Sequence, residues 1–317
     1  VGVQPMTGPV GQIHTLRVRY SDTMNDTSAG NTDTTAGEEA LSPFKIAEAY
    51  SGDAATAKAA STAALEGAAG RKMSIQILKQ TVEAKTRKLS ARWTFEAAQD
   101  AQSMHGIDVE AEIMAALAQE ITAEIDQEVI GSLVTLSGGA AQTYNQGTVS
   151  GTATFVGDEH AALAVQINRV SNLIAQRTRR GAGNWAVVSP FALTILQSAT
   201  TSAFARTTEG TFEAPTNTKM VGTLNNAMKV YVNTYAADNA PVLIGYKGAS
   251  ESDAAAFYCP YIPLMSSGVV LDPGTFEPTV SFMTRYGYVE LNNTASSLGN
   301  AADYLGNVAI AAGVTFQ

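Results

Sequence analysis

The sequence has few of the side chains on which cysteine and histidine chemistry depends. Cys259 is the only cysteine among 317 residues, which excludes a disulfide within the chain and fits a reducing compartment. Its apolar, aromatic surroundings (FYCPY) predict a buried small hydrophobe and not a nucleophile. The three histidines, His14, His105 and His160, lie far apart without metal-ligand spacing, so we predict no metal site.

Charge and long apolar runs are also scarce. Only 15% of residues are charged and the net charge is −9, which argues against a general affinity for nucleic acid, because displacing counterions from phosphates requires a basic surface. No apolar run approaches the length of a membrane-spanning helix and no segment resembles a signal peptide, so we expect no membrane association. The 45% hydrophobic content is sufficient for a sizeable core, in two domains or one elaborate one.

Motifs of the common enzyme classes are absent. There is no P-loop lysine motif and no G-x-S-x-G elbow. The segment GAGNWA, residues 181–186, matches G-x-G-x-x-A, but it precedes a predicted strand, whereas the dinucleotide fingerprint opens a helix that binds a pyrophosphate. The carboxylates could include a glycosidase-like pair, but nothing distinguishes two of them. We therefore predict neither an enzyme nor a cofactor.

The most regular feature that is present is a long amphipathic helix over residues 108–133, with Asp108 as its N-cap. A step of four residues turns about 400° on a 3.6-residue helix, so an apolar row at this spacing drifts around the axis. Different elements should therefore pack against the two ends. The apolar row consists of Val109, Ile113, Leu117, Ile121, Ile125, Val129 and Leu133.

Residues 71–92 concentrate positive charge, with Glu83 as their only carboxylate, and their alternation predicts extended ribbon. Two interpretations stay open: a solvated basic face, or a ribbon that docks on an acidic neighbouring subunit. For the second, the candidate contact residues are Arg71, Lys72, Lys79, Lys85, Arg87, Lys88 and Arg92. The candidate acidic partners lie toward the end of the long helix, where carboxylates oppose the helix dipole, and are Glu120, Glu124, Asp126 and Glu128.

The remaining elements predict an α+β order without regular βαβ alternation. Residues 1–13 resemble an extended arm, and the Ala-, Thr- and Ser-rich residues 21–70 have little to bury, so we expect a mobile excursion with one short helix. Helices are expected at 94–105, at 160–180 and from Pro190. Strands are expected at 14–20, 184–189, 228–232, 242–246, 256–261 and 279–290.

An arm, a ribbon of polarised charge and a long helix all need neighbours to be stable, which is typical of a subunit built for assembly. Four long segments strengthen this interpretation, because they resemble the major capsid protein of T-even-type tailed bacteriophages. They are VGVQPMTGPVGQI at the start, residues 83–130 from EAKTRKLSARW to DQEVI, NWAVVSPFALTILQSA from residue 184, and PTVSFMTRYGYVEL from residue 278.

The resemblance implies the Hong Kong 97-type capsid fold. Its parts would be an N-terminal arm at 1–13, an E-loop at 14–93, a peripheral domain at 94–137 and 260–317 that holds the long spine helix, and an axial domain at 138–259. Copies would form hexamers that build an icosahedral or prolate head shell around double-stranded DNA, without sequence-specific binding. The resemblance further implies vertex, decoration and scaffold proteins as partners, proteolytic maturation of the N-terminus, and a virion capsid assembled in the bacterial host cytoplasm.

Two other classes stay open. One is a different self-assembling protein, such as a surface-layer, sheath or encapsulin-type shell subunit. The other is a carbohydrate-active enzyme or binding domain. Sugar sites usually stack rings on aromatic side chains, so the presence of only two tryptophans, Trp93 and Trp185, argues weakly against the second class.

Overall fold

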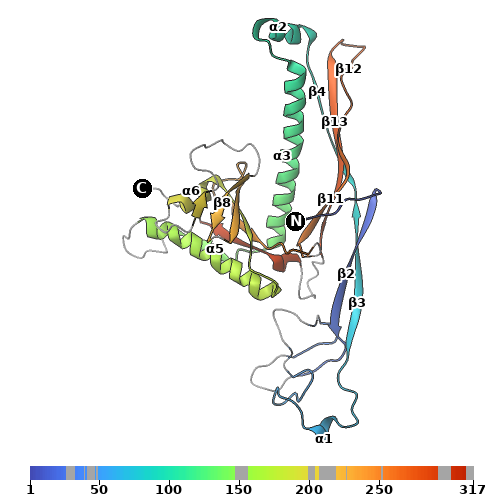
Figure 1. Cartoon of the computed structure of the whole chain (residues 1–317), viewed down its shortest axis with the longest axis vertical. Helices are drawn as coiled ribbons and strands as arrows, with labels where there is room; N and C mark the ends of the chain where they lie inside the picture. Colours follow the sequence, from blue (N-terminus) through green and yellow to red (C-terminus); the bar gives the residue numbers. More distant parts are fainter. Residues whose placement is uncertain are drawn as a thin grey trace.

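The computed structural model describes residues 1–25, 33–38, 40, 47, 49–146, 156–198, 204–206, 219–225, 227–250, 253–291 and 301–311. The molecule is long (Figure 1): a ribbon extends from one end, a helix and a narrow sheet extend to the other, and a second sheet with its helices lies to the side. Among the described residues, no helix has the length and apolar character needed to span a membrane.

The long helix is confirmed as α3, Val109–Ser137, and it continues one turn beyond the predicted end. Its N-terminus is fixed by the side chain of Asp108, which accepts a hydrogen bond of 3.1 Å from the backbone N–H of Glu110. The shorter helix α2, Phe95–His105, precedes it. Gly106 ends α2 with a φ of 66°, a left-handed conformation that glycine adopts without strain.

A narrow sheet accompanies α3 along its length. Its strands follow the order β1 (Gly2–Val3), β11 (Ala256–Ser266), β13 (Pro278–Glu290) and β12 (Val270–Leu271), and β4 (Lys85–Arg92) also pairs with β13. Leu117 and Ile121 of α3 pack against Val280 and Phe282 of β13. At the other end of α3, Leu133 and Leu136 pack into a different cluster, whose buried members from the two sheets are Leu243, Ala256, Phe257, Cys259 and Leu305. The prediction that separate elements cover the two ends is confirmed.

The second sheet forms the laterally placed domain. Its strand order is β5 (Gln142–Tyr144), β14 (Leu305–Ile310), β10 (Val242–Gly245), β6 (Trp185–Val188), β9 (Met228–Val232), β8 (Lys219–Leu224) and β7 (Phe204–Arg206). Helices α5 (Val156–Thr178) and α6 (Pro190–Ser198) pack on this sheet through buried side chains such as Leu163, Ile167 and Ile195. The 3₁₀ turn η1 (Ala301–Tyr304) leads into β14, which the sequence patterns did not predict.

The ribbon consists of β2 (Val10–Tyr20) and β3 (Met73–Glu83), antiparallel from the pair Val10 and Glu83 to the pair Tyr20 and Met73. The predicted extended structure over residues 71–92 is thus confirmed as β3 followed by β4. The strand predicted at residues 14–20 begins earlier, at residue 10, because its partner β3 continues to Glu83 and offers backbone groups for four further residues.

The excursion between β2 and β3 has a small core of its own. Tyr20, Met24, Ala40, Ala49 and Tyr50 are buried together, so the expectation that this tract has little to bury is wrong for its described part. Small alanines pack around two tyrosine rings whose centroids lie 4.4 Å apart. The short helix expected in this tract is confirmed in its described part as α1, Thr62–Leu65. The expected mobility of the tract stays a prediction.

Candidate assembly surfaces

The side chain of Arg87 links β4 to the long helix. Its Nη1 lies 2.8 Å from Oε2 of Glu124, its other terminal nitrogen binds Glu128, and its Nε donates to the hydroxyl of Tyr286 at 2.7 Å. Tyr286 in turn donates its hydroxyl proton to Glu128. Burial tends to raise the pKa of Glu128, but the hydrogen bonds from Arg87 and Tyr286 outweigh it and hold that pKa below its ordinary value. Burial and the hydrogen bond to Glu128 raise the pKa of Tyr286 to about 12.

This network lies within one chain. The docking of the basic stretch, which includes Arg87, on the acidic residues of a neighbouring subunit stays a prediction. The contact within one chain follows from the pairing of β4 with β13. Because the sheet that contains β13 packs on α3, strand β4 of the basic stretch lies beside the acidic face of the helix of its own chain.

The other predicted cations have separate environments. Arg71 donates from Nη1 to the carbonyl oxygens of Ala49, Tyr50 and Gly52, so it braces the excursion between β2 and β3. Nη1 of Arg92 lies 3.6 Å from Oε2 of Glu277. Lys85 contributes electrostatically to the lowered pKa of Glu128. Lys72, Lys79 and Lys88 are exposed, and none of the three forms an ion pair with the described residues of its own chain.

The two remaining predicted carboxylates lie on different sides of α3. Glu120 is exposed beside Glu124 and Tyr235, at the edge of a hollow of about 450 Å³. Asp126 faces the opposite side, where partial burial raises its pKa. The structure therefore brings only Glu124 and Glu128 together with a cation of the predicted set.

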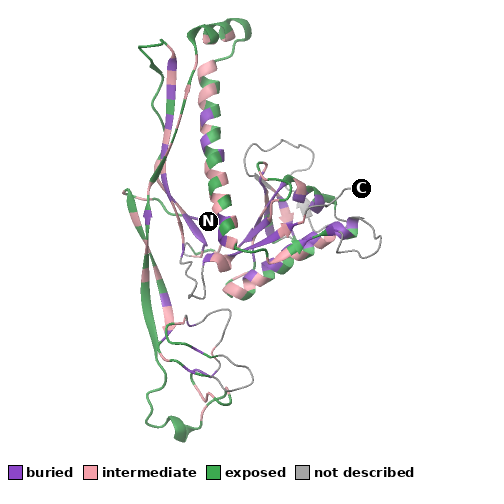
Figure 2. Ribbon diagram, turned by 180° about the vertical axis from the view of Figure 1, so that it is seen from behind, coloured by how far each residue is buried: buried purple, intermediate pink, exposed green. Residues whose placement is uncertain are grey.

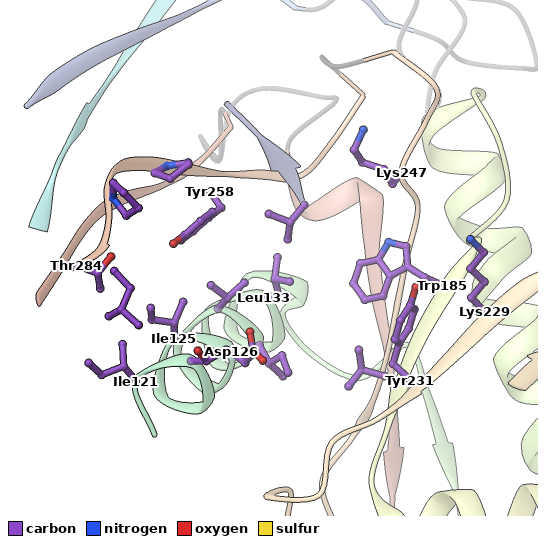
Figure 3. Close-up of a pocket in the computed structure, with 18 of the residues that line it drawn as sticks. Ile121, Ile125, Asp126, Leu133, Trp185, Lys229, Tyr231, Lys247, Tyr258 and Thr284 are labelled. Atoms are coloured by element: carbon purple, nitrogen blue, oxygen red, sulfur yellow. The ribbon is translucent and has the colours of Figure 1, made fainter. Parts of the chain in front are cut away.

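Asp126 lies in a large groove of about 1090 Å³ between α3 and the two sheets (Figure 3). The lining is mainly apolar, with Ile125 and Leu133 from α3 and Trp185 from β6, while Lys229 and Lys247 lie at its edge. A lining of this composition is more typical of packing between elements than of a catalytic site. Within the described residues, no three His, Cys, Asp or Glu side chains are grouped so that they could hold a metal ion. Cys259 is buried, as predicted, and its burial raises the pKa of its thiol.

One face of the ribbon exposes apolar side chains that the sequence patterns did not single out. The register places Leu16 opposite Ile77 and Val18 opposite Ile75, with the pair His14 and Lys79 next along the same face. Leu16, Ile75 and Ile77 are 67%, 69% and 68% exposed, and the ribbon is exposed along most of its length (Figure 2). Such a contiguous apolar face marks an interaction surface. The alternation within residues 71–80 was visible in the sequence, but the opposing strand was needed to place the apolar positions on one face.

A second exposed apolar surface lies at the far end of the molecule, which we call the distal tip: residues 93–112 and 264–278. Phe276 is 68% exposed and Met104 78% exposed. The rings of Phe276 and Phe95 stack with centroids 5.5 Å apart. Phe276 has a φ of 57°, which is strained for an aromatic residue. The tip contains seven carboxylates and no lysine or arginine.

Comparisons with known proteins agree with this geometry. Residues 1–310 match the model of the family described as major capsid protein Gp23. The chain is 34% identical over 252 residues to the major capsid protein of Vibrio phage KVP40, covering 73% of this chain and 48% of that protein. It is 34% identical over 248 residues to the major capsid protein of Enterobacteria phage T4, covering 72% of this chain and 46% of that protein. The chain thus spans about half the length of these relatives.

The fold has counterparts among solved structures. A chain from Mycobacterium phage Bobi superimposes with a TM-score of 0.57 at 15% sequence identity, covering 98% of this chain and 88% of that chain. At this identity the likeness concerns the fold alone. It confirms the Hong Kong 97-type capsid fold, with mixed helix and sheet, that the sequence resemblance implied.

Proposed function

Because the chain belongs to the Gp23 family of phage major capsid proteins, we propose that it is the subunit from which a tailed-phage head shell is built. Copies associate as hexamers, and the hexamers form an icosahedral or prolate shell around double-stranded DNA. We assign the chain a structural role without enzymatic activity, since proteins named major capsid protein are its relatives.

The observation that carries this proposal is the exposed apolar face of the ribbon. Leu16, Ile75 and Ile77 lie on a two-stranded ribbon that no described part of the same chain covers. An isolated two-stranded ribbon is marginally stable in water, and it gains stability when its apolar face is buried. A neighbouring copy is the partner that a shell of identical subunits supplies.

The division into parts follows the family. We propose residues 1–13 as the arm, 14–93 as the E-loop, 94–137 with 260–317 as the peripheral domain, and 138–259 as the axial domain. The ribbon forms the core of the E-loop, α3 is the spine helix, and the second sheet belongs mainly to the axial domain, through which copies meet around the hexamer axis.

Contacts between subunits use the part of the basic stretch that is left exposed. Lys72, Lys79 and Lys88 are the cations that we keep in an inter-subunit role, whereas Arg87 stabilises its own chain. The net charge of −9 limits adhesion of packaged DNA to the shell wall, so DNA is enclosed without being bound in a sequence-specific way.

Partners and processing are proposed on the same basis. Vertex, decoration and scaffold proteins complete the head, and a protease removes an N-terminal segment during maturation. The family places the protein in the virion capsid, and we propose that assembly takes place in the bacterial host cytoplasm.

The test is a double variant of one cross-strand pair, Leu16→Ser with Ile77→Ser. The two side chains are exposed in a single copy, so the monomer should keep its thermal unfolding midpoint, while sedimentation velocity should show loss of the hexamers and larger particles formed by the unmodified chain. Val165→Ser is the matched control, because Val165 is equally exposed but lies on α5. Assembly of the double variant at the unmodified yield would contradict the proposal.

A further inference from the structure

The apolar row of helix α3 is covered at its two ends and open in its middle. Leu117 and Ile121 pack against β13, and Leu133 packs into the cluster between the two sheets, where all three are buried. Ile125 and Val129 lie between these ends and are only half-buried. Both line the groove of about 1090 Å³ (Figure 3). The described part of the chain therefore leaves the centre of its long helix without a full cover.

The groove is elongated and has aromatic walls. Its lining follows α3 from Ile121 to Leu133, a rise of about 18 Å at 1.5 Å per residue. Trp185 of β6 and Tyr231 of β9 form the wall opposite the helix, and Tyr258 of β11 flanks the space between them (Figure 3). A space of this length beside a helix suits a second helix of about 12 residues.

The ring of Trp185 has a fixed place in this wall. Trp185 pairs in register with Gly245 of β10, and a Cβ added at Gly245 would collide with the indole ring. The ring thus occupies space that only a glycine leaves open, and it stays half-buried at the groove. A tryptophan held in this way is typical of the residues that anchor a binding partner.

The charges of the groove favour an acidic partner. Lys229 and Lys247 lie at its edge, and neither forms an ion pair with the residues that the structure describes. Asp126 is the only carboxylate among the described lining residues, and burial raises its pKa, which favours the neutral form. The lining is therefore positive on balance, although the chain as a whole carries a net charge of −9. Carboxylates of a partner would complement the two lysines.

From this geometry we propose that the groove binds an acidic, amphipathic helix of a partner protein. The apolar face of that helix covers Ile125 and Val129 and contacts Trp185, while its carboxylates lie beside Lys229 and Lys247. The inference rests on the proposed function, because a subunit of a head shell assembles together with other proteins. The competing occupant is helix α2 of a second copy, which is exposed and carries Glu96 and Asp100.

The probe is a synthetic peptide of about 14 residues, capped at both ends, with leucine along one helical face and glutamate along the other. A matched peptide has lysine in place of each glutamate. The full-length chain carries Trp93→Phe, so that Trp185 is its remaining tryptophan. Binding in the groove removes water from the Trp185 ring, so its emission should shift to shorter wavelength and saturate with the glutamate peptide, and should not change with the lysine peptide.

Reversing the charge at the edge tests the electrostatic part. Lys229→Glu with Lys247→Glu should weaken binding of the glutamate peptide by about tenfold. Lys58→Glu with Arg169→Glu is the matched control, because both side chains are exposed, lie outside the groove and change the net charge by the same amount. The control pair should keep the affinity of the unmodified chain.

The outcomes separate this inference from the proposed function. A saturable shift with the glutamate peptide alone, weakened by reversal of the two edge lysines, supports the acidic helix. A shift with both peptides, with neither, or with equal affinity after the reversal overturns it. A shift that grows with chain concentration in the absence of peptide, with dimers in sedimentation velocity, assigns the groove to a second copy and also overturns it. Electron microscopy of the unmodified chain tests the shell function separately: particles leave that function in place when peptide binding fails, and a lack of any oligomer contradicts it when peptide binding succeeds.

Discussion

Arg87 shows how one side chain can join three elements of a fold. Its guanidinium binds Glu124 and Glu128 on α3 and the hydroxyl of Tyr286 on β13, while its backbone belongs to β4. The planar group presents several donors in a fixed geometry, which a lysine at this position would lack. The cluster therefore sets how the sheet lies against the helix.

Replacing Arg87 with Met should lower the free energy of unfolding by about 1 kcal/mol, a figure that allows for the partial exposure of the two carboxylates. Urea titration at neutral pH measures the change. Lys88→Met, at the adjacent exposed position, is the control and should leave the urea midpoint unchanged. Equal midpoints for both variants would show that the cluster is not stabilising.

His160 should make the stability of the lateral domain depend on pH. Its ring is buried, with Nδ1 2.5 Å from the hydroxyl oxygen of Ser198, and burial lowers its pKa although nearby Glu159 opposes the shift. In the unfolded chain the imidazole titrates near its ordinary pKa of about 6.5. Below that pH the unfolded state binds the proton more readily, so the free energy of unfolding should fall as the pH is lowered from about 7.5 to 5.5.

The test compares the native chain with His160→Gln by urea titration across this pH range. The Gln variant cannot take up the proton, so its stability should vary less with pH than that of the native chain. Identical slopes would mean that other groups cause the pH dependence.

Among the elements, helix α3 contains a glycine that packing does not require. A Cβ added at Gly131 would have no atom within 4 Å, and the residue lies inside the helix. Gly131→Ala should raise the free energy of unfolding by about 0.5 to 1 kcal/mol, because alanine loses less backbone entropy on folding into a helix. Calorimetry should show a higher melting temperature. A lower melting temperature would indicate that helix α3 makes a contact at this position that only glycine allows.

At the junction of the ribbon with the sheet, replacing a glycine should lower the free energy of unfolding. A Cβ at Gly287 of β13 would lie 2.5 Å from Cγ2 of Val82 and 3.1 Å from the carbonyl oxygen of Glu83 on β3. Gly287→Ala should therefore destabilise the chain by about 1 to 3 kcal/mol, since the ribbon must shift away from the sheet. The same calorimetric measurement, with Gly131→Ala as the matched glycine replacement, tests it, and an unchanged melting temperature would contradict this close packing.

Elements with strong local signals could be predicted from the sequence, and elements defined by distant partners could not. Helix α3, helix α6 beginning at Pro190, and strand β9 at Met228–Val232 follow from periodicity, proline placement and β-branched residues. Strand β14 was not predicted, because its short segment becomes a strand through pairing with β10 and β5, which are remote in sequence. The start of β2 was misplaced for the same reason.

The candidate surfaces were predicted only in part. Composition revealed the basic stretch and the acidic end of α3, and the structure brings Arg87 to Glu124 and Glu128 as the charges suggested. Composition could not tell a contact within one chain from a contact between two. It also could not reveal the apolar face of Leu16 and Ile77, which depends on the register between strands more than 50 residues apart.

For the whole molecule, the long shape places two exposed apolar surfaces far apart. The ribbon and the distal tip project from opposite ends (Figure 1), and each exposes apolar side chains with charges of opposite sign. A single copy leaves both uncovered, whereas an array of copies can cover both. Coverage of surfaces by neighbouring copies is typical of shells, in which many identical weak contacts act together.

Electron microscopy of the material in which the polypeptide naturally occurs, with the intact mass of the polypeptide measured alongside, tests whether this chain builds a closed shell. We expect icosahedral or prolate shells in which this polypeptide is the main component. A monodisperse monomer in that material would contradict it.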